Sequence, residues 1–309
     1  MKTFINIGTR ASQLALAQTK WVINRITAHY PDIRVDLIKI RTKGDRIIDK
    51  PLSTIGGKGL FVKEIEEALN RGEIDVAVHS LKDVPAELPD TLCIGIIPER
   101  EDPHDVLISK GNITLEDLPE GSCIGTSSLR RSAQLLHYRS DLKIVPLRGN
   151  LDTRIRKLVD SVDIQAIVVA AAGLKRIGLT YKITQPLSFD LMLPAVGQGA
   201  LGLEFRRDDH ETRDILTFLD HYQTRVAVEA ERSFMMELKG GCQIPVSGFA
   251  RLKDDSINLD GLVADLDGST IFRDVVIGPT EKAKELGAAL AHRLLDAGAR
   301  EILEKIYGQ

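Results

Sequence analysis

Residues 56–85 read GGKGLFVKEIEEALNRGEIDVAVHSLKDVP. After the glycine-rich turn at the start, apolar residues recur at helical spacing over residues 61–69, and Gly72 ends the predicted helix. Residues 74–78 form an apolar run typical of a buried strand, and residues 79–85 form the loop at its carboxyl end. This alternation of helix and strand predicts an α/β sheet with parallel strands.

The same alternation precedes this stretch. We predict a strand over residues 4–8, a helix that Ser12 caps and Pro31 stops, and a strand over residues 33–40, where apolar residues alternate. Together with residues 74–78, these strands define a first α/β lobe.

The pattern starts again after residues 98–103, a charged, proline-flanked stretch suited to a crossing between domains. Strands are predicted over residues 122–125, 143–147 and 165–170, with helices between them. A second α/β lobe therefore follows the first.

Beyond about residue 220 the pattern changes. Long helices are predicted over residues 223–238 and 281–306, and three strands lie between them within residues 246–276. Strands grouped between helices fit a small α+β domain.

Composition places the chain among soluble globular proteins. Its 309 residues suggest two or three domains at about 150 residues each, and 43% apolar with 28% charged residues excludes disordered and fibrous classes. Lysine and arginine total 41 against 44 acidic residues, so the net charge of −3 gives no overall attraction to nucleic acid or an anionic membrane. Aromatic residues, at 5%, offer few platforms for stacking bases. We expect neither nucleic acid nor a membrane as a partner.

The three cysteines are too few and too far apart for a disulfide scaffold or a zinc site. Because no apolar stretch is long enough for a signal peptide or a membrane span, a reducing cytosol is the expected compartment. Cys93 and Cys123 lie among apolar strand residues, as structural thiols do. Cys242 follows Gly240 and Gly241 in a predicted loop, where a nucleophile, a covalent anchor and an incidental thiol all remain open interpretations.

Cationic side chains gather in the predicted loops at the carboxyl ends of strands, where open α/β sheets bind ligands. They are Arg10, Lys58 and Lys82 in the first lobe and Arg130, Arg131, Arg148, Arg154 and Arg176 in the second. Residues 125–128 offer an anion the N–H groups of a helix start, and the dipole of that helix disfavours the two arginines in its first turn. A negatively charged ligand explains the whole set, whereas solvated surface or ion pairs within the protein remain the alternative for any single arginine.

Asp83 lies just past a buried strand and before Pro85, which fixes the turn. A carboxylate there either stabilises a developing cation in a substrate or caps the turn and pairs with Lys82. His79 has no second metal ligand at helical spacing, so a hydrogen-bonded core histidine is favoured over a metal ligand. Residues 56–59 lack the spacing of a phosphate-binding P-loop and form either a flexible loop or a lid over a ligand.

The chain carries, in order, the motifs GGKGLFVKE (56–64), VHSLKDVP (78–85), GTSSLRR (125–131), LRGN (147–150), LPAVGQG (193–199) and GGCQ (240–243). Together they resemble the motifs of the porphobilinogen deaminase family, also called hydroxymethylbilane synthases. The resemblance covers essentially the whole chain.

The resemblance implies an α/β fold of three domains in a monomer. The first two domains look like the lobes of type II periplasmic binding proteins, the second being inserted into the first, and a small α+β domain follows. In this sequence domain 1 comprises residues 1–98 and 196–218, domain 2 residues 99–195, and domain 3 residues 219–309.

The resemblance also implies the reaction. Enzymes of this family are transferases that join four porphobilinogen molecules head to tail with release of ammonia, and then hydrolyse the product to hydroxymethylbilane, a precursor of haem and other tetrapyrroles. The chain grows on a dipyrromethane cofactor that is made from porphobilinogen and bound through a thioether. By its motif Cys242 is the attachment point, and Asp83 is the catalytic carboxylate that stabilises the cation left when ammonia departs.

Each pyrrole carries an acetate and a propionate, and these carboxylates are the negatively charged groups that the cationic side chains would bind. By the same motif match, the cofactor-binding residues are Lys58, Lys82, Asp83, Thr126, Ser128, Arg130, Arg131 and Arg148, and the substrate-binding residues are Arg10, Ser12, Arg148, Arg154, Arg176 and Gln198. Charge-assisted bonds of this kind contribute roughly 1.5–3 kcal/mol each. Thr54 stands where many relatives have a lysine, and a hydroxyl cannot supply that charge.

Two other functions fit parts of the pattern. A two-lobed architecture also serves proteins that only bind small anions, but such a binder needs neither Asp83 nor a third domain with Cys242. RNA binding through the arginine loops is disfavoured by the net charge of −3 and the few aromatic residues. We expect a monomer that acts on the small molecule porphobilinogen and holds no metal.

Overall fold

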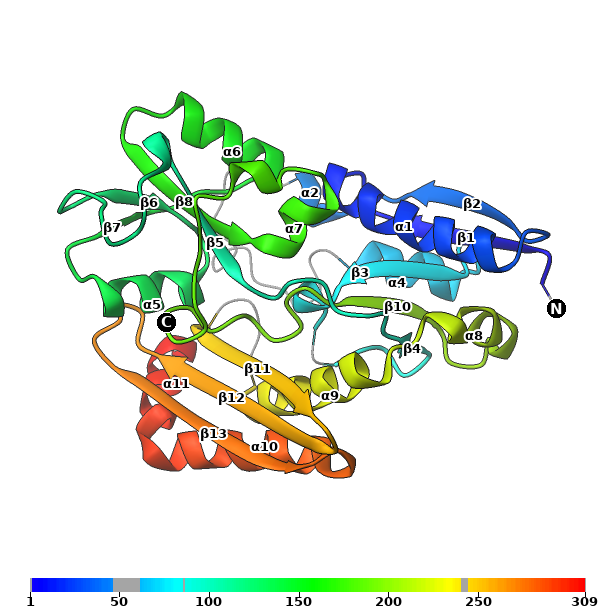
Figure 1. The fold of residues 1–309 in the computed structure, drawn as a ribbon. Coiled ribbons are helices and arrows are strands. Elements are labelled where there is room, and N and C mark those ends of the chain that lie inside the picture. Colours follow the sequence, from blue (N-terminus) through cyan, green and yellow to red (C-terminus); the bar gives the residue numbers. More distant parts are fainter. Residues whose placement is uncertain (1, 47–61, 86, 240–243, 309) are drawn as a thin grey trace. The chain divides into compact units, whose positions relative to one another are not determined.

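The computed structural model describes residues 2–46, 62–85, 87–239 and 244–308. The chain divides into two compact units, Met1–Glu101 with Ala200–Arg225 and Asp102–Gly199 with Val226–Gln309. Among the described residues, the first unit holds one sheet and the second unit holds two (Figure 1).

The sheet of the first unit has the strand order β2-β1-β3-β10-β4. Its strands are β1 (Phe4–Thr9), β2 (Arg34–Lys39), β3 (Val76–Ser80), β4 (Leu92–Ile96) and β10 (Leu201–Arg206). The helices of this unit are α1 (Gln13–His29), α2 (Lys43–Arg46), α4 (Lys63–Asn70) and α8 (His210–Leu216). The first strands and helices follow the predicted alternation.

Local sequence signals account for the first strand and helix. The predicted cap of α1 is confirmed, because the Ser12 hydroxyl accepts a hydrogen bond from the N–H of Ala15 at 3.3 Å. Val22 and Ile26 on the buried side of α1 belong to the same core cluster as Ile5 and Ile7 of β1. Strand periodicity and helix periodicity thus bury their apolar residues against each other.

The first sheet of the second unit has the order β7-β6-β8-β5-β9. Its strands are β5 (Asp105–Ser109), β6 (Cys123–Gly125), β7 (Lys143–Val145), β8 (Ile164–Ala170) and β9 (Gln185–Pro186). Its helices are α5 (Leu129–Tyr138), α6 (Leu151–Asp160) and α7 (Ala171–Arg176).

The two five-stranded sheets share one pattern of strand directions. In each, three neighbouring strands are parallel, the fourth is antiparallel to them, and the fifth is antiparallel to the fourth. The strands predicted for the two lobes are these parallel neighbours, so the prediction of parallel strands is confirmed, and the antiparallel strands β10 and β5 were not among the predicted ones. Local alternation of helix and strand did not reveal β10, because it joins its sheet about a hundred residues after β4 and pairs with strands distant in sequence.

The other sheet of the second unit is an antiparallel meander of β11 (Val246–Lys253), β12 (Ser256–Ala264) and β13 (Ile271–Pro279). It accompanies α9 (Tyr222–Glu237), α10 (Ala283–Leu294) and α11 (Arg300–Tyr307), and α10 packs on β12 and β13 (Figure 1). A further cluster, which includes Ala133 of α5, Phe249 of β11 and Leu262 of β12, joins this part to the neighbouring lobe. The division into three domains stays a prediction.

The last helix, predicted as continuous over residues 281–306, is interrupted. A π-helical turn, Leu295–Ala299, separates α10 from α11, and Gly298 within it has a φ of 121°. A Cβ atom on Gly298 would also lie 2.8 Å from the ring of Phe272. The break therefore requires a glycine, both for its backbone angle and for the close approach of the ring.

A cluster of ionic groups ties the amino-terminal residues to the return segment of the first unit. Lys2 Nζ donates to Asp75 Oδ1 at 2.9 Å and to Asp209 Oδ2 at 2.7 Å, and Arg206 Nη2 donates to Asp209 Oδ2 at 2.8 Å. Burial alone would raise the pKa of Asp209, but hydrogen bonds from Lys2 and Thr212 outweigh it and lower the pKa to about 2.

We predict that Asp209→Asn destabilises the protein by about 1–2 kcal/mol at pH 7, a figure reduced for solvent screening. Because the folded-state pKa of about 2 lies below the ordinary 3.8, the contribution is fully present above about pH 4 and is lost as the pH falls towards 2. Urea unfolding at a series of pH values measures it, with Asp208→Asn at the exposed neighbouring position as the control. A difference between wild type and Asp209→Asn that stayed constant down to pH 2 would contradict this origin.

Gly149 forms the turn between β7 and α6. Its φ is 118°, outside the left-handed helical well, and a Cβ atom there would lie 2.8 Å from Thr153 Cγ2. Its carbonyl oxygen accepts a hydrogen bond from Arg154 Nε at 2.8 Å. The turn thus needs a glycine and fixes an arginine of the predicted site.

We predict that Gly149→Ala destabilises the protein by about 3 kcal/mol, through backbone strain and the contact with Thr153. The matched variant is Gly178→Ala, at a φ of 71° with nothing within 4 Å of the added Cβ atom, and it should cost only about 1 kcal/mol. Denaturant unfolding of both variants checks the difference. Equal losses would show that the contact with Thr153 contributes nothing.

Candidate functional site

The predicted cations of the second lobe follow three parallel strands. Because β6, β7 and β8 are parallel neighbours, their carboxyl ends lie at one edge of the sheet. Thr126, Ser128, Arg130 and Arg131 follow β6, Arg148 and Arg154 follow β7, and Arg176 lies at the end of α7, which follows β8. The fold thus places these residues at the edge where open α/β sheets bind ligands.

The start of α5 is closed by two hydroxyl groups. Thr126 Oγ1 accepts a hydrogen bond from the N–H of Ser128 at 3.2 Å, and Ser128 Oγ accepts from the N–H of Arg131 at 3.4 Å. Each hydroxyl is an acceptor in these bonds and has its own O–H to donate. Both hydroxyl groups therefore cap the start of the helix as acceptors, and these bonds do not use their O–H donors.

Arg130 and Arg131 share one buried carboxylate. Arg130 Nη1 donates to Asp105 Oδ2 at 2.7 Å, while Arg131 Nε and Nη2 donate to Asp105 Oδ1 at 3.0 and 2.6 Å. Asp105 is 0% exposed and each arginine 5%. Carbonyl oxygens complete the cluster, Leu193 O for Arg130 and Val168 O for Arg131.

This cluster changes the interpretation of the two arginines. The sequence suggested a ligand as the anion beside them, and the structure places a protein carboxylate there, as the alternative of ion pairs within the protein foresaw. Burial lowers the pKa of Arg130, and the charge of Asp105 opposes that effect. Sequence reasoning missed Asp105; the signal that could have found it is an acid at the start of a buried strand in a lobe with two adjacent arginines.

The other predicted residues of the second unit lie against backbone carbonyl groups. Arg154 Nε donates to Gly149 O at 2.8 Å, Arg176 Nη2 donates to Gly199 O at 2.8 Å, and Gln198 Nε2 donates to Pro103 O at 2.7 Å. Arg148 differs, because its Nη1 atom is buried without a hydrogen-bond partner in the described part of the chain. A buried guanidinium nitrogen in this condition needs an acceptor from beyond the described residues.

The first unit repeats the arrangement with fewer cations. β1 and β3 are parallel neighbours; Arg10 and Ser12 follow β1, while Lys82 and Asp83 follow β3. Lys82 and Asp83 belong to a short 3₁₀ turn, Leu81–Asp83, in which Lys82 is half-buried and Asp83 exposed.

Buried contacts fix this turn. The side chain of Leu81 is buried, its N–H donates to Ala200 O at 3.0 Å, and its carbonyl oxygen accepts from the N–H of Val84 at 3.1 Å. Gln18 Nε2 donates to Ser80 Oγ at 2.8 Å and so ties α1 to the end of β3. Buried side-chain and backbone contacts therefore fix the turn, while the Asp83 carboxylate is exposed to solvent.

His79 is a core residue, as predicted. Its Nε2 atom lies 2.8 Å from Glu204 Oε2, and both side chains are buried between β3 and β10.

Among the described residues no group of three or more His, Cys, Asp or Glu is placed to hold a metal ion. Nor does any described helix have the length and apolar character needed to cross a membrane.

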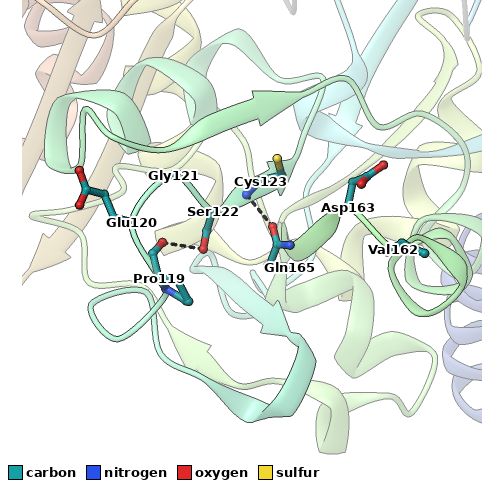
Figure 2. A pocket seen from close by; sticks show the side chains of 8 residues that line it. All are labelled: Pro119, Glu120, Gly121, Ser122, Cys123, Val162, Asp163 and Gln165. Atoms are coloured by element: carbon teal, nitrogen blue, oxygen red, sulfur yellow. Dashed lines mark hydrogen bonds between the residues drawn. The ribbon is translucent and has the colours of Figure 1, made fainter.

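Cys93 and Cys123 are half-buried, on β4 and at the start of β6. Burial raises the pKa of the Cys93 thiol, so it is a poor nucleophile at neutral pH. Figure 2 shows Cys123 on a surface hollow with Ser122, Asp163 and Gln165. This hollow lies at the amino ends of β6 and β8, away from the carboxyl edge that carries the arginines.

Lys58, Thr54, residues 56–59 and Cys242 lie outside the described residues. Their predicted roles, including the attachment of a cofactor at Cys242, stay predictions.

The solved structures to which this chain is similar are distant from it. The methionine binding protein MetQ is 17% identical, with a TM-score of 0.46 over 70% of this chain and 89% of that chain. The aliphatic sulphonate binding protein SsuA from Escherichia coli is 14% identical, with a TM-score of 0.41 over 77% of this chain and 71% of that chain.

Sequence comparisons give close relatives. Residues 5–214 match the family model described as porphobilinogen deaminase, dipyromethane cofactor binding domain, and residues 226–296 match that of the porphobilinogen deaminase C-terminal domain. The porphobilinogen deaminase of Geobacter sulfurreducens is 52% identical over 98% of this chain and 95% of its own length. That of Maridesulfovibrio salexigens is also 52% identical, over 98% of each chain. This chain therefore belongs to the porphobilinogen deaminase family.

Proposed function

We propose that this protein is a porphobilinogen deaminase, a transferase that condenses four porphobilinogen molecules on a covalent dipyrromethane and hydrolyses the product to hydroxymethylbilane. Membership of the family over nearly the whole chain carries the proposal. The site residues add chemical support, because a tetrapyrrole precursor has two carboxylates on every ring and both sheets end in cations.

The side chains at the edge of the second sheet fit a dipyrromethane. Its acetate and propionate groups need charged donors, and Arg130, Arg131 and Arg148 are guanidinium groups that suit planar carboxylates. The buried Nη1 atom of Arg148, which has no hydrogen-bond partner among the described residues, would bond to such a carboxylate. Thr126 and Ser128 offer hydroxyl donors beside the start of α5, where the helix dipole also favours an anion.

Asp83 suits the step in which ammonia leaves. Breaking the bond between the methylene carbon and nitrogen of porphobilinogen sends the electron pair to ammonia and leaves a cation delocalised over the pyrrole. A carboxylate that accepts hydrogen bonds from pyrrole N–H groups stabilises that cation. Asp83 is exposed on a turn that buried contacts hold in place, so it meets the substrate without rearrangement of the turn.

Lys82, next to Asp83, supplies a positive charge for a substrate or cofactor carboxylate, as do Arg10 near the same edge and Arg154 and Arg176 in the second unit. Ser12 and Gln198 add neutral polar groups. When bound, the dipyrromethane supplies the pyrrole end on which the chain is extended, and we assign its attachment to the thiol of Cys242.

Further proposals rest on the family resemblance: a monomer in the cytosol, without nucleic acid, and three domains with the boundaries given above. Separate apolar cores support the domain division. Phe234, Leu259 and Leu290 lie in a core of the α+β part, whereas Leu107 and Leu135 lie in a core of the preceding lobe.

We predict that intact-mass spectrometry of the freshly purified protein shows an adduct of about two pyrrole units, and that Cys242→Ser lacks it because no thioether forms. Cys93→Ser and Cys123→Ser are the matched controls and should keep the adduct. An unmodified mass for folded wild type that does not turn over porphobilinogen contradicts the proposed function, and an unmodified mass for active wild type contradicts the covalent dipyrromethane. An adduct that survives in Cys242→Ser contradicts only the attachment point.

We predict that Asp83→Asn keeps the adduct and lowers kcat by about 10²–10³-fold, because it retains the size of the side chain and removes the charge that stabilises the cation. Steady-state kinetics with porphobilinogen, together with the intact mass, measures both effects. Asp90→Asn, at an exposed position of the same unit, is the control and should turn over normally. Near-normal turnover of Asp83→Asn would remove this carboxylate from the mechanism.

A further inference from the structure

The two guanidinium groups at the start of α5 are both bound to one carboxylate, that of Asp105. Asp105 is the first residue of β5 and is 0% exposed. Both of its oxygen atoms are used, Oδ2 by Arg130 and Oδ1 by Arg131. Asp105 therefore fixes the direction of both arginine side chains at once.

The cluster is not neutral. One carboxylate faces two guanidinium groups, which keep their protons in proteins, so a net positive charge remains in a place nearly closed to water. The positive end of α5 lies beside it and adds to the imbalance. A second negative charge is the natural complement of this cluster, because the acceptors that the two guanidinium groups have beside Asp105 in the described structure are the neutral carbonyl oxygens of Leu193 and Val168.

The two arginines differ in how far the protein uses them. Arg131 commits Nε and Nη2 to Asp105 and Nη1 to Val168 O. Arg130 takes part through Nη1 alone, which donates to Asp105 and to Leu193 O. The hydrogen bonds of Nη1 thus define the orientation of Arg130, and its Nε and Nη2 atoms take no part in the bonds to Asp105 and Leu193 O.

We propose that Asp105 is a positioning residue: its carboxylate aligns Arg130 and Arg131 in advance, and the positive charge left over receives one carboxylate of the pyrrole ligand. The inference rests on the proposed function, which supplies that ligand. Arginine side chains have many rotatable bonds, but Asp105 orders these two before the ligand binds. They therefore lose little conformational entropy on binding, and the ligand binds more tightly than it would to disordered arginines.

The test compares two variants of the full-length protein. Asp105→Asn keeps the size of the side chain and removes its charge, whereas Asp105→Glu keeps the charge and adds a methylene group. For each we measure the fraction of molecules with the dipyrromethane mass, KM and kcat for porphobilinogen, and the midpoint of urea unfolding.

In Asp105→Asn the adduct fraction should fall and KM should rise about ten- to hundredfold, while kcat per loaded molecule changes little. Asp105→Glu should lie between Asp105→Asn and wild type in both quantities, because the charge is restored at a shifted position. A residue that only fills space would give the opposite order, since an extra methylene in a closed core is tolerated less well than asparagine.

The matched control is Asp260→Asn. Asp260 is 3% exposed and accepts two hydrogen bonds from Arg273, at 3.0 and 2.5 Å, in the antiparallel sheet. Its loss should lower the unfolding midpoint and leave the adduct fraction and KM at their wild-type values. The control thus separates the general cost of breaking a buried ion pair from an effect on the ligand.

Wild-type KM and adduct fraction in Asp105→Asn overturn the inference, and so does an order in which asparagine works better than glutamate. If Asp105→Asn does not fold, Asp105→Glu decides alone: a raised KM in a folded protein supports positioning, and an unchanged KM refutes it. Failure of both variants to fold also refutes it, because Asp105 then acts on stability alone. Wild-type protein with neither adduct nor activity would instead refute the proposed function.

Discussion

Arg130 and Arg131 are adjacent in sequence, nearly closed to water and at the positive end of a helix, so burial, mutual repulsion and the dipole all oppose their charges. Asp105 is the countercharge that makes this arrangement tenable. Three separate segments of the second unit supply acceptors to the two arginines. β5 brings the carboxylate, β8 brings the carbonyl of Val168, and the segment before Gly197 brings the carbonyl of Leu193.

The two lobes share one arrangement of strands and charged side chains. In each, parallel strands end together, and short helices or turns that follow the strands carry charged side chains at that edge. The first lobe adds an exposed carboxylate, Asp83, to its cations, whereas the second carries more arginines and one buried carboxylate. Cationic side chains suit the carboxylates of a ligand, and an exposed carboxylate suits a developing positive charge, so the two residue types offer different chemistry.

Signals that act within a few residues were readable from the sequence. The Ser12 cap, the apolar stripe around Ile65 and the alternation of helix and strand depend on neighbours in the chain, and the structure contains all of them. The described candidate residues follow strands, as the pattern of strands and loops predicted, although Lys58 and Cys242 are not among the residues described. The partner of Arg130 and Arg131 could not be read, since Asp105 lies about twenty-five residues away and only the packing of β5 beside β8 brings it close. Strand β10 and the break at Gly298 were missed for the same reason, because each depends on a partner distant in sequence: the strands beside β10, and Phe272 against Gly298.

The place of β10 in the first sheet has a consequence for how the protein is made. β4 lies at an edge of that sheet and is hydrogen-bonded to β10, which leaves the ribosome roughly a hundred residues later, about 5–20 s at ordinary rates of synthesis. Until then β3 and β4 have no strand between them, and the amino-terminal lobe is an incomplete sheet with open edges. The second lobe must therefore be synthesised while the first is still unfinished, and the nascent chain has to keep those edges from pairing with other chains until its own strand arrives.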